Sequence, residues 1–167
     1  MTDHSVSVEF VVLAMDGTVI PVNEAAEFFG KHSDQLDDFG AQMGRITFQA
    51  SGTEPLFLGG NLLWLLPTYC VTVVEHVLVH GSYDVVPPDL DYAIRFRRDA
   101  ATVTVDSEHM DPHVYPAKPV LAALLDTMDE YCEICVVLWP DIATDYVEEF
   151  SHDVERMRTA LADAGLD

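Results

Sequence analysis

Positive charge is the scarcest property of this sequence. Asp and Glu number 29 against 8 Lys and Arg, and the only lysines are Lys31 and Lys118. The formal net charge of −21 argues against binding nucleic acid through its phosphates, because like charges repel. Three causes of such acidity stay open: a salt-rich cytoplasm or GC-rich genome, a partner with a basic surface such as a nuclease or other toxin, or mimicry of the DNA backbone.

Long apolar runs, an export signal and a disulfide framework are also missing. The longest apolar stretch, residues 56–74, is broken by Gly59, Gly60, Asn61 and Pro67, so we expect no membrane span and no membrane partner. The first residues show neither the basic segment nor the cleavage site of a secretory signal. Three irregularly spaced cysteines fit a reducing compartment. The expected location is the cytoplasm.

The apolar content, 49% of the 167 residues, is enough for one domain over residues 1–167. Two β-hairpins stand out. The first joins residues 5–14 to 18–22 through an Asp16-Gly17 turn, and the second joins residues 90–97 to 102–106 through residues 98–101. The other expected segments are a strand at 45–50, a short extended piece at 83–86, and a proline-containing loop at 107–119.

Helical spacing of apolar residues predicts the remaining elements. Pro67 is unfavourable inside a helix but tolerated at its first position, so a helix over 67–79 is favoured over an unbroken one from Asn61, with a buried strand as the alternative. The other expected helices are one beginning at an Asn23 cap, a short one within 34–44, one over 120–136 with a single apolar stripe, and one over 142–161. The sequence therefore predicts an α+β fold: a mainly antiparallel sheet built from hairpins, with three or four helices, the last two C-terminal and packed on one face.

Two pairs of side chains could bind a metal ion. His76 and His80 are four residues apart, a spacing that places both imidazoles on one side of a helix. Cys132 and Cys135 could chelate zinc, and the two pairs together would form a Cys₂His₂ site if their helices pack together. The competing interpretation, which we favour, is that both cysteines are buried thiols on the apolar stripe of their helix.

A second candidate site lies in the segment that follows the second hairpin. Five side chains that commonly ligate metals fall within eight residues: Asp106, Glu108, His109, Asp111 and His113. Loops after strands often carry functional sites, although a chain this acidic also gathers carboxylates in loops by chance. Phosphate-binding loops, dinucleotide motifs and nucleophile elbows are absent from the sequence, so no cofactor is expected apart from zinc.

One resemblance to a known family comes from the layout of the middle of the chain. Three segments follow in order: Leu62-Leu63-Trp64-Leu65-Leu66-Pro67, then Gly81-Ser82-Tyr83, then Tyr92-Ala93-Ile94-Arg95-Phe96-Arg97-Arg98 with a valine-rich return strand. Over about residues 60–106 this layout resembles small acidic immunity proteins of bacterial polymorphic toxin systems. The resemblance implies a protein that binds another protein and has no enzymatic activity.

The leading functional hypothesis is therefore an acidic intracellular protein-binding domain, immunity-like or inhibitor-like, with a basic protein partner. A second hypothesis is a metal-binding protein or metal-dependent enzyme that uses His76 and His80. A third is a housekeeping protein of a salt-adapted cell, whose acidity serves solubility alone.

Overall fold

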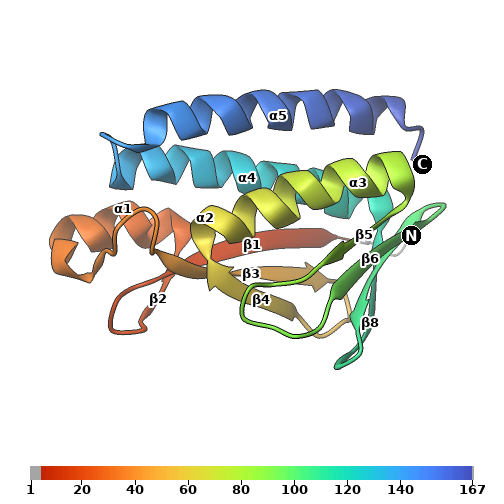
Figure 1. Ribbon diagram of the computed structural model, residues 1–167, viewed down its shortest axis with the longest axis horizontal. Helices are drawn as coiled ribbons and strands as arrows, with labels where there is room; N and C mark the ends of the chain where they lie inside the picture. The colour runs from red at the N-terminus through yellow and green to blue at the C-terminus, as the bar shows by residue number, and fades with distance from the viewer. Residues whose placement is uncertain (1–4, 167) are drawn as a thin grey trace.

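Two four-stranded antiparallel sheets and a layer of helices make up the part of the chain that the computed structural model describes, residues 5–166 (Figure 1). The strand order is β2-β1-β3-β4 in the first sheet and β5-β6-β7-β8 in the second. This arrangement confirms the predicted α+β class with its mainly antiparallel pairing.

The first sheet contains the first predicted hairpin. Strand β1 pairs with β2 across the Asp16-Gly17 turn and with β3 on its other side, and β4 pairs with β3. Alternation along β1 places Val8, Phe10 and Val12 on one face, where all three are buried. The strands are β1 (Val6–Leu13), β2 (Val19–Pro21), β3 (Met43–Ala50) and β4 (Leu56–Asn61).

The second sheet contains the second predicted hairpin, extended by a strand that the sequence did not predict. Residues 107–119 were expected to form a loop, but 110–116 form β8, which pairs with β7. The prolines in β8 are tolerated because β8 lies at the edge of its sheet, where one side needs no backbone donors. The strands are β5 (Ser82–Val85), β6 (Ile94–Asp99), β7 (Thr102–Ser107) and β8 (Met110–Pro116).

The first helix, α1 (Val22–Lys31), starts two residues earlier than the sequence indicates. Asn23 lies inside the helix, and Pro21 occupies the capping position, so the predicted Asn23 cap is wrong. The short helix expected within 34–44 is also wrong, because only a 3₁₀ turn over Ser33–Gln35 forms there. Instead, the buried Gln42 side chain holds this connection, donating to the Leu13 carbonyl oxygen at 2.6 Å and accepting from the Asp37 amide at 3.1 Å.

The middle helix runs without a break from Leu62 to His80, and the predicted start at Pro67 is wrong. Asn61 caps it by accepting from the Leu63 amide at 3.0 Å, so Pro67 falls in the second turn. The strain is taken up by a π-helical turn, Thr68–Thr72, in which the Val73 amide bonds to the Thr68 carbonyl five residues back. The three parts are α2 (Leu62–Pro67), this π turn and α3 (Val73–His80).

By length and composition alone, this 19-residue helix is the one candidate membrane span among residues 5–166. More than half of its apolar window, 56%, is buried inside the fold. Its largest buried side chain, Tyr69, packs against Trp64 and Phe96 with ring centroids about 6 Å apart. The helix therefore contributes to the core of the protein.

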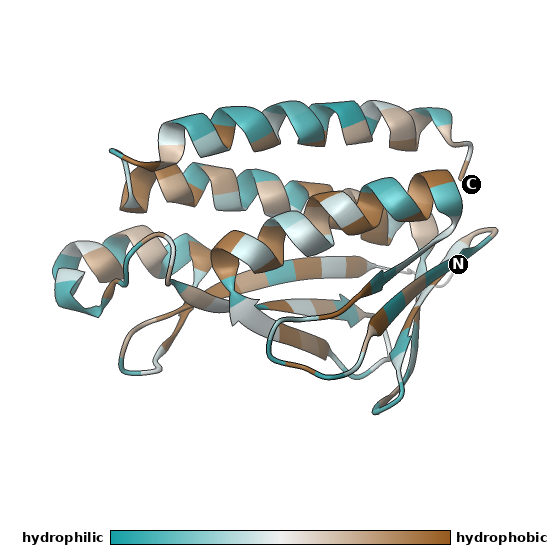
Figure 2. Ribbon diagram, viewed as in Figure 1, coloured by the Kyte–Doolittle hydropathy of each residue, from teal (hydrophilic) through white to brown (hydrophobic). Residues whose placement is uncertain are grey.

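The last two helices, α4 (Ala117–Leu138) and α5 (Ala143–Asp163), lie on the same side of the first sheet, as predicted (Figure 1). Helix α4 packs on β1, where the Thr127 hydroxyl lies 2.9 Å from the Val8 carbonyl oxygen and Tyr131 meets Phe10 edge to face. Helix α5 packs mainly on α4, which lies between it and the first sheet. Its outward side is hydrophilic, and apolar residues gather below it (Figure 2).

Candidate functional site

The two histidines of the predicted metal site lie on α3, four residues apart as expected. Their ring centroids are 5.4 Å apart, and the His76 ring stacks on Tyr83 at 4.4 Å. Cys132 and Cys135 lie on α4 and are buried. Within residues 5–166 no group of three or more His, Cys, Asp or Glu side chains is placed to hold a metal ion. The structure therefore does not gather the four side chains into one metal-holding group, and zinc binding remains a prediction.

All three cysteines are free thiols in the core, as the favoured interpretation of the α4 pair expects. Burial raises the pKa of Cys132 to about 11 and that of Cys135 to about 12, and it raises the pKa of Cys70 as well. Because the thiolate is the reactive form, we expect all three side chains to react slowly in the folded protein near neutral pH.

This burial predicts how the thiols respond to a labelling reagent. At pH 8 the folded protein should react with 5,5′-dithiobis(2-nitrobenzoic acid) at least about 100-fold more slowly than the unfolded chain, because burial disfavours the thiolate and restricts access of the reagent. In 6 M guanidinium chloride all three thiols should react within seconds. Rapid labelling of one thiol in the native protein would contradict the burial of the cysteines.

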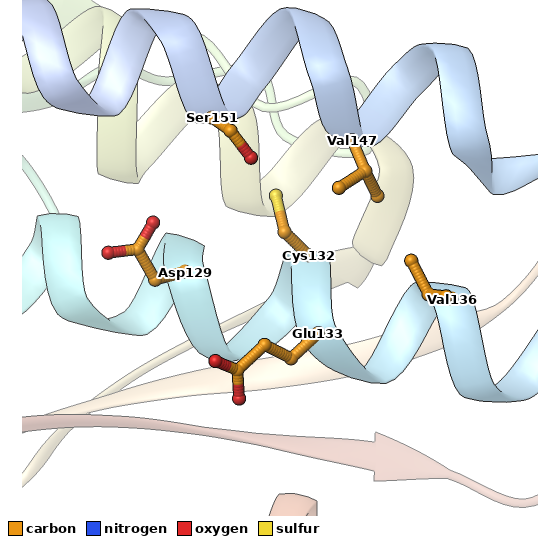
Figure 3. A pocket seen from close by; sticks show the side chains of 6 residues that line it. All are labelled: Asp129, Cys132, Glu133, Val136, Val147 and Ser151. Carbon is orange, nitrogen blue, oxygen red and sulfur yellow. The ribbon is translucent and has the colours of Figure 1, made fainter.

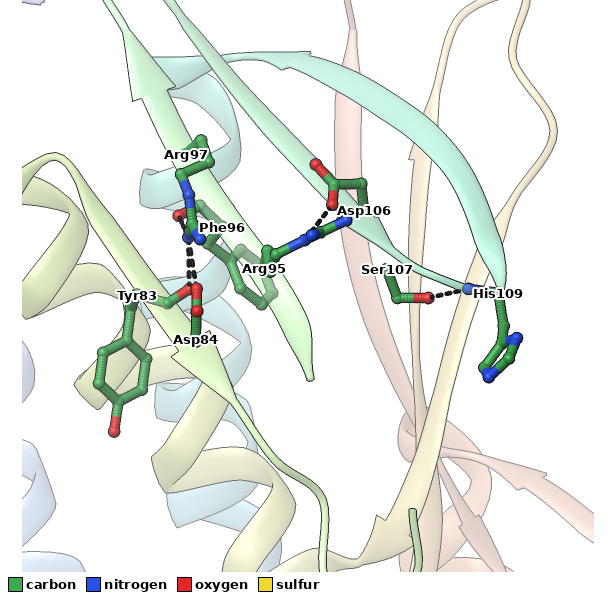
Figure 4. Close-up of polar contacts among 8 residues, drawn as sticks. All are labelled: Tyr83, Asp84, Arg95, Phe96, Arg97, Asp106, Ser107 and His109. Atoms are coloured by element: carbon green, nitrogen blue, oxygen red, sulfur yellow. Dashed lines mark hydrogen bonds and ion pairs between the residues drawn. The ribbon is translucent and has the colours of Figure 1, made fainter. Parts of the chain in front are cut away.

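The predicted 106–113 site is the tip of the β7–β8 hairpin rather than a loop. Asp106 pairs with Arg95 at 2.5 Å, so its carboxylate is already used within the sheet (Figure 4). Beyond it, the His109 ring lies against Tyr92, with centroids 4.7 Å apart, and His113 stacks on Tyr115. The exposed side chains of Glu108 and Asp111 complete the predicted set. Strand pairing thus spreads these residues along a hairpin.

The arginines of β6 are also occupied by local partners. Arg97 pairs with Asp84 of the neighbouring strand at 2.5 Å (Figure 4), and Arg98 donates to the Val77 carbonyl oxygen at the end of α3. Cations stabilise the carbonyl end of a helix, which explains the placement of Arg98. These contacts hold the second sheet together and against α3.

One side of α4 is a solvent-exposed surface that combines acidic and apolar side chains. We define the α4 face as Asp126, Asp129, Glu130, Glu133, Val136 and Val137. Figure 3 shows part of it, with α5 on one side and the first sheet on the other. Val136 and Val137 are 45% and 58% exposed. The predicted apolar stripe of this helix included Val136 as a core residue, and the structure corrects that assignment.

Hollows border the α4 face on both sides. One, of about 470 Å³, lies between α4 and α5, and Cys132, Val147 and Ser151 line it with residues of the face (Figure 3). The other, of about 360 Å³, lies between α4 and α1, and its apolar walls include Val22 and Ile134. Glu133 borders both hollows. The face is therefore a ridge with a depression on each side, a shape that can receive side chains of another molecule.

The carboxylates of the α4 face repel one another. Arg158 from α5 pairs with Asp126 at 2.8 Å and Asp129 at 2.5 Å. Within residues 5–166 no such cation pairs with Glu130 or Glu133. Partial burial raises the pKa of Glu130, and the charges of Asp126, Glu133 and Glu9 raise it further. The α4 face thus has unbalanced negative charge beside exposed valines.

Partial burial of Glu130, together with this repulsion, predicts that Glu130→Gln stabilises the protein at neutral pH. Because the folded state raises the pKa of Glu130, stability is full below the ordinary value of 4.5 and decreases as pH rises through the folded pKa. The gain at pH 7 should stay below about 1 kcal/mol, because the group is largely solvated. Thermal melts should show the gain at pH 7 in low salt and none at pH 3.5. A variant less stable than the wild type at pH 7 would refute the repulsion.

A sequence signal for the α4 face was present but not used. Asp126, Glu130 and Glu133 recur at four and three residues, which places them on one side of a helix. Their significance depends on which side of α4 the rest of the chain leaves open, and that is a tertiary property.

Comparison of the chain with protein-family models, curated proteins and solved structures found no match.

Proposed function

We propose that this protein is an intracellular protein-binding domain that docks a partner with a basic surface on the α4 face. The proposal rests on one observation: the α4 face presents two carboxylates without a cationic partner, Glu130 and Glu133, beside the exposed side chains of Val136 and Val137. Apolar contact would supply binding free energy, and the carboxylates would select a cationic partner.

Electrostatics favours a basic partner in two ways. Partial burial is the main cause of the raised pKa of Glu130, and repulsion from neighbouring carboxylates adds to it. Lys or Arg side chains placed beside Glu130 would relieve this repulsion and favour its charged form. At longer range, a net charge of −21 steers cationic molecules towards the protein and increases their association rate. Both effects weaken as ionic strength rises.

The resemblance of the layout of residues 60–106 to immunity proteins supports a binding function. That resemblance implies a protein that binds another protein and has no enzymatic activity. A binder of this kind needs no catalytic residues, only a surface complementary to its partner.

Affinity capture tests the proposal. The wild-type chain, immobilised and exposed to an extract of its own cells, should retain a basic protein at 50 mM NaCl and lose most of it at 500 mM NaCl. A bait carrying Val137→Asp, which adds charge to the apolar part of the face, should retain at least about tenfold less. A bait carrying Val114→Asp, a valine on β8 that is 52% exposed, is the matched control and should retain the partner. Equal loss from both baits, or retention of no basic protein, would refute the proposal.

A further inference from the structure

A second candidate surface lies along β4, which is the strand at one edge of the first sheet. Two adjoining hollows follow this edge, one of about 390 Å³ and one of about 140 Å³. Gly59, Pro87 and Leu90 line both, and aromatic side chains deepen them: Trp64 in the larger, and Tyr69 and Tyr92 in the smaller. The edge therefore borders an apolar groove rather than open solvent.

The register of the β3–β4 ladder shows which backbone groups of β4 face this groove. The Leu62 amide donates to the Gln42 carbonyl oxygen at 2.8 Å, in the same register that pairs Gly60 with Gly44. Hydrogen-bonded pairs alternate along an antiparallel ladder. Residues 56, 58 and 60 therefore bond to β3, and the N–H and C=O groups of Phe57 and Gly59 point away from it, towards the groove.

These outward groups have no backbone partner within residues 5–166. The neighbouring segment, residues 86–93, contains Pro87 and Pro88. Proline has no N–H group, so these two residues cannot donate a hydrogen bond to β4. Gly59 is exposed and carries no side chain, and Phe57 is 52% exposed. The edge therefore has unused backbone donors and acceptors that another chain can approach closely.

Charge around the groove indicates what kind of chain would bind. Asp89 lines the larger hollow, and Asp91 is exposed on the same segment. Arg45 is the nearby cation, and it lies over the Phe57 ring at 4.7 Å. An extended segment in which apolar residues alternate with Lys or Arg would place apolar side chains in the hollows and cations beside the two aspartates.

We propose that the free edge of β4 binds an extended, basic and apolar segment of another protein as an added β-strand. Backbone hydrogen bonds to Phe57 and Gly59 would hold the segment, and the aromatic hollows would select its apolar side chains. The inference is independent of the proposed function, because the α4 face borders α1 and α5 and shares no residue with this groove.

Gly59 allows a sharp test. Gly59→Pro removes the outward N–H but no bond to β3, and proline is tolerated at such edge positions, so the protein should keep its circular dichroism spectrum. Gly59→Ala is the control: it retains the N–H, and its new Cβ would lie 3.7 Å from the nearest atom, the Gly44 carbonyl oxygen.

The probe is a phage-displayed library of random twelve-residue peptides selected on the immobilised full chain. Enriched peptides should alternate apolar residues with Lys or Arg, bind the wild type and Gly59→Ala within about threefold, and bind Gly59→Pro at least about tenfold more weakly. Three results would overturn the inference: no enrichment over an uncoated surface, enriched peptides that bind Gly59→Pro as tightly as the wild type, or a dimer of this chain formed through β4.

Discussion

Replacing Gly44 with alanine is expected to destabilise the protein by about 3 kcal/mol, because the added methyl group has no room in the packed sheet. Gly44 lies within β3, between β1 and β4. A Cβ at this position would overlap the Leu62 side chain and would lie 2.5 Å from the Val11 carbonyl oxygen. One of these neighbours is backbone in the centre of a sheet, so relieving the overlap requires strands to move.

Urea unfolding followed by circular dichroism measures this effect, with Gly59→Ala as the matched substitution in the adjacent strand. Gly59→Ala should change the free energy of unfolding by less than about 0.5 kcal/mol, because its Cβ makes only an ordinary van der Waals contact, 3.7 Å from the Gly44 carbonyl oxygen. A Gly44→Ala variant as stable as Gly59→Ala would show that the close approach of α2 to β3 is misplaced.

Truncating Phe10 to alanine is expected to cost about 3–5 kcal/mol, because it removes a fully buried ring and leaves a cavity. Phe10 is 1% exposed and contacts Tyr131 edge to face, with ring centroids 5.7 Å apart. The contact joins β1 to α4, so its loss weakens the packing of the helices on the first sheet.

The control for this variant is Phe57→Ala, which removes an exposed ring from the same sheet. Phe57→Ala should lower the free energy of unfolding by less than about 1 kcal/mol. The loss of the cation–π contact with Arg45 would add to this amount. The two denaturation curves should keep the same slope and differ in midpoint. Similar midpoints would mean that α4 does not pack on β1 as described.

The parts of the fold that could be predicted from the sequence are those fixed by local chemistry. The Asp16-Gly17 turn, the alternation of β6 and β7 and the spacing of α4 and α5 each determine an element through neighbours in the sequence. Pro67 misled prediction because a π turn further along the helix relieved the strain that proline imposes. Strand β8 was missed because its stability comes from pairing with β7, which overrides its prolines.

The surfaces were harder to predict than the elements, because exposure is decided by packing. Cys132 and Cys135 were correctly placed in the core, since their position on an apolar stripe is a local property. Val136 was assigned to the same stripe, yet it is exposed because α5 covers one side of α4 and leaves the adjoining side open. The unpaired edge of β4 could not be seen without the strand order.

The most direct test of the central claim is the dissociation constant of the complex with the captured basic protein, measured by isothermal titration calorimetry. A Glu130→Gln/Glu133→Gln variant should bind at least about tenfold more weakly than wild type at 50 mM NaCl, since it loses both uncompensated charges of the α4 face. Glu54→Gln/Asp99→Asn, with the same change of net charge elsewhere on the surface, should bind within about threefold of wild type. Equal weakening by both variants would show that only the overall charge matters and would contradict docking on α4.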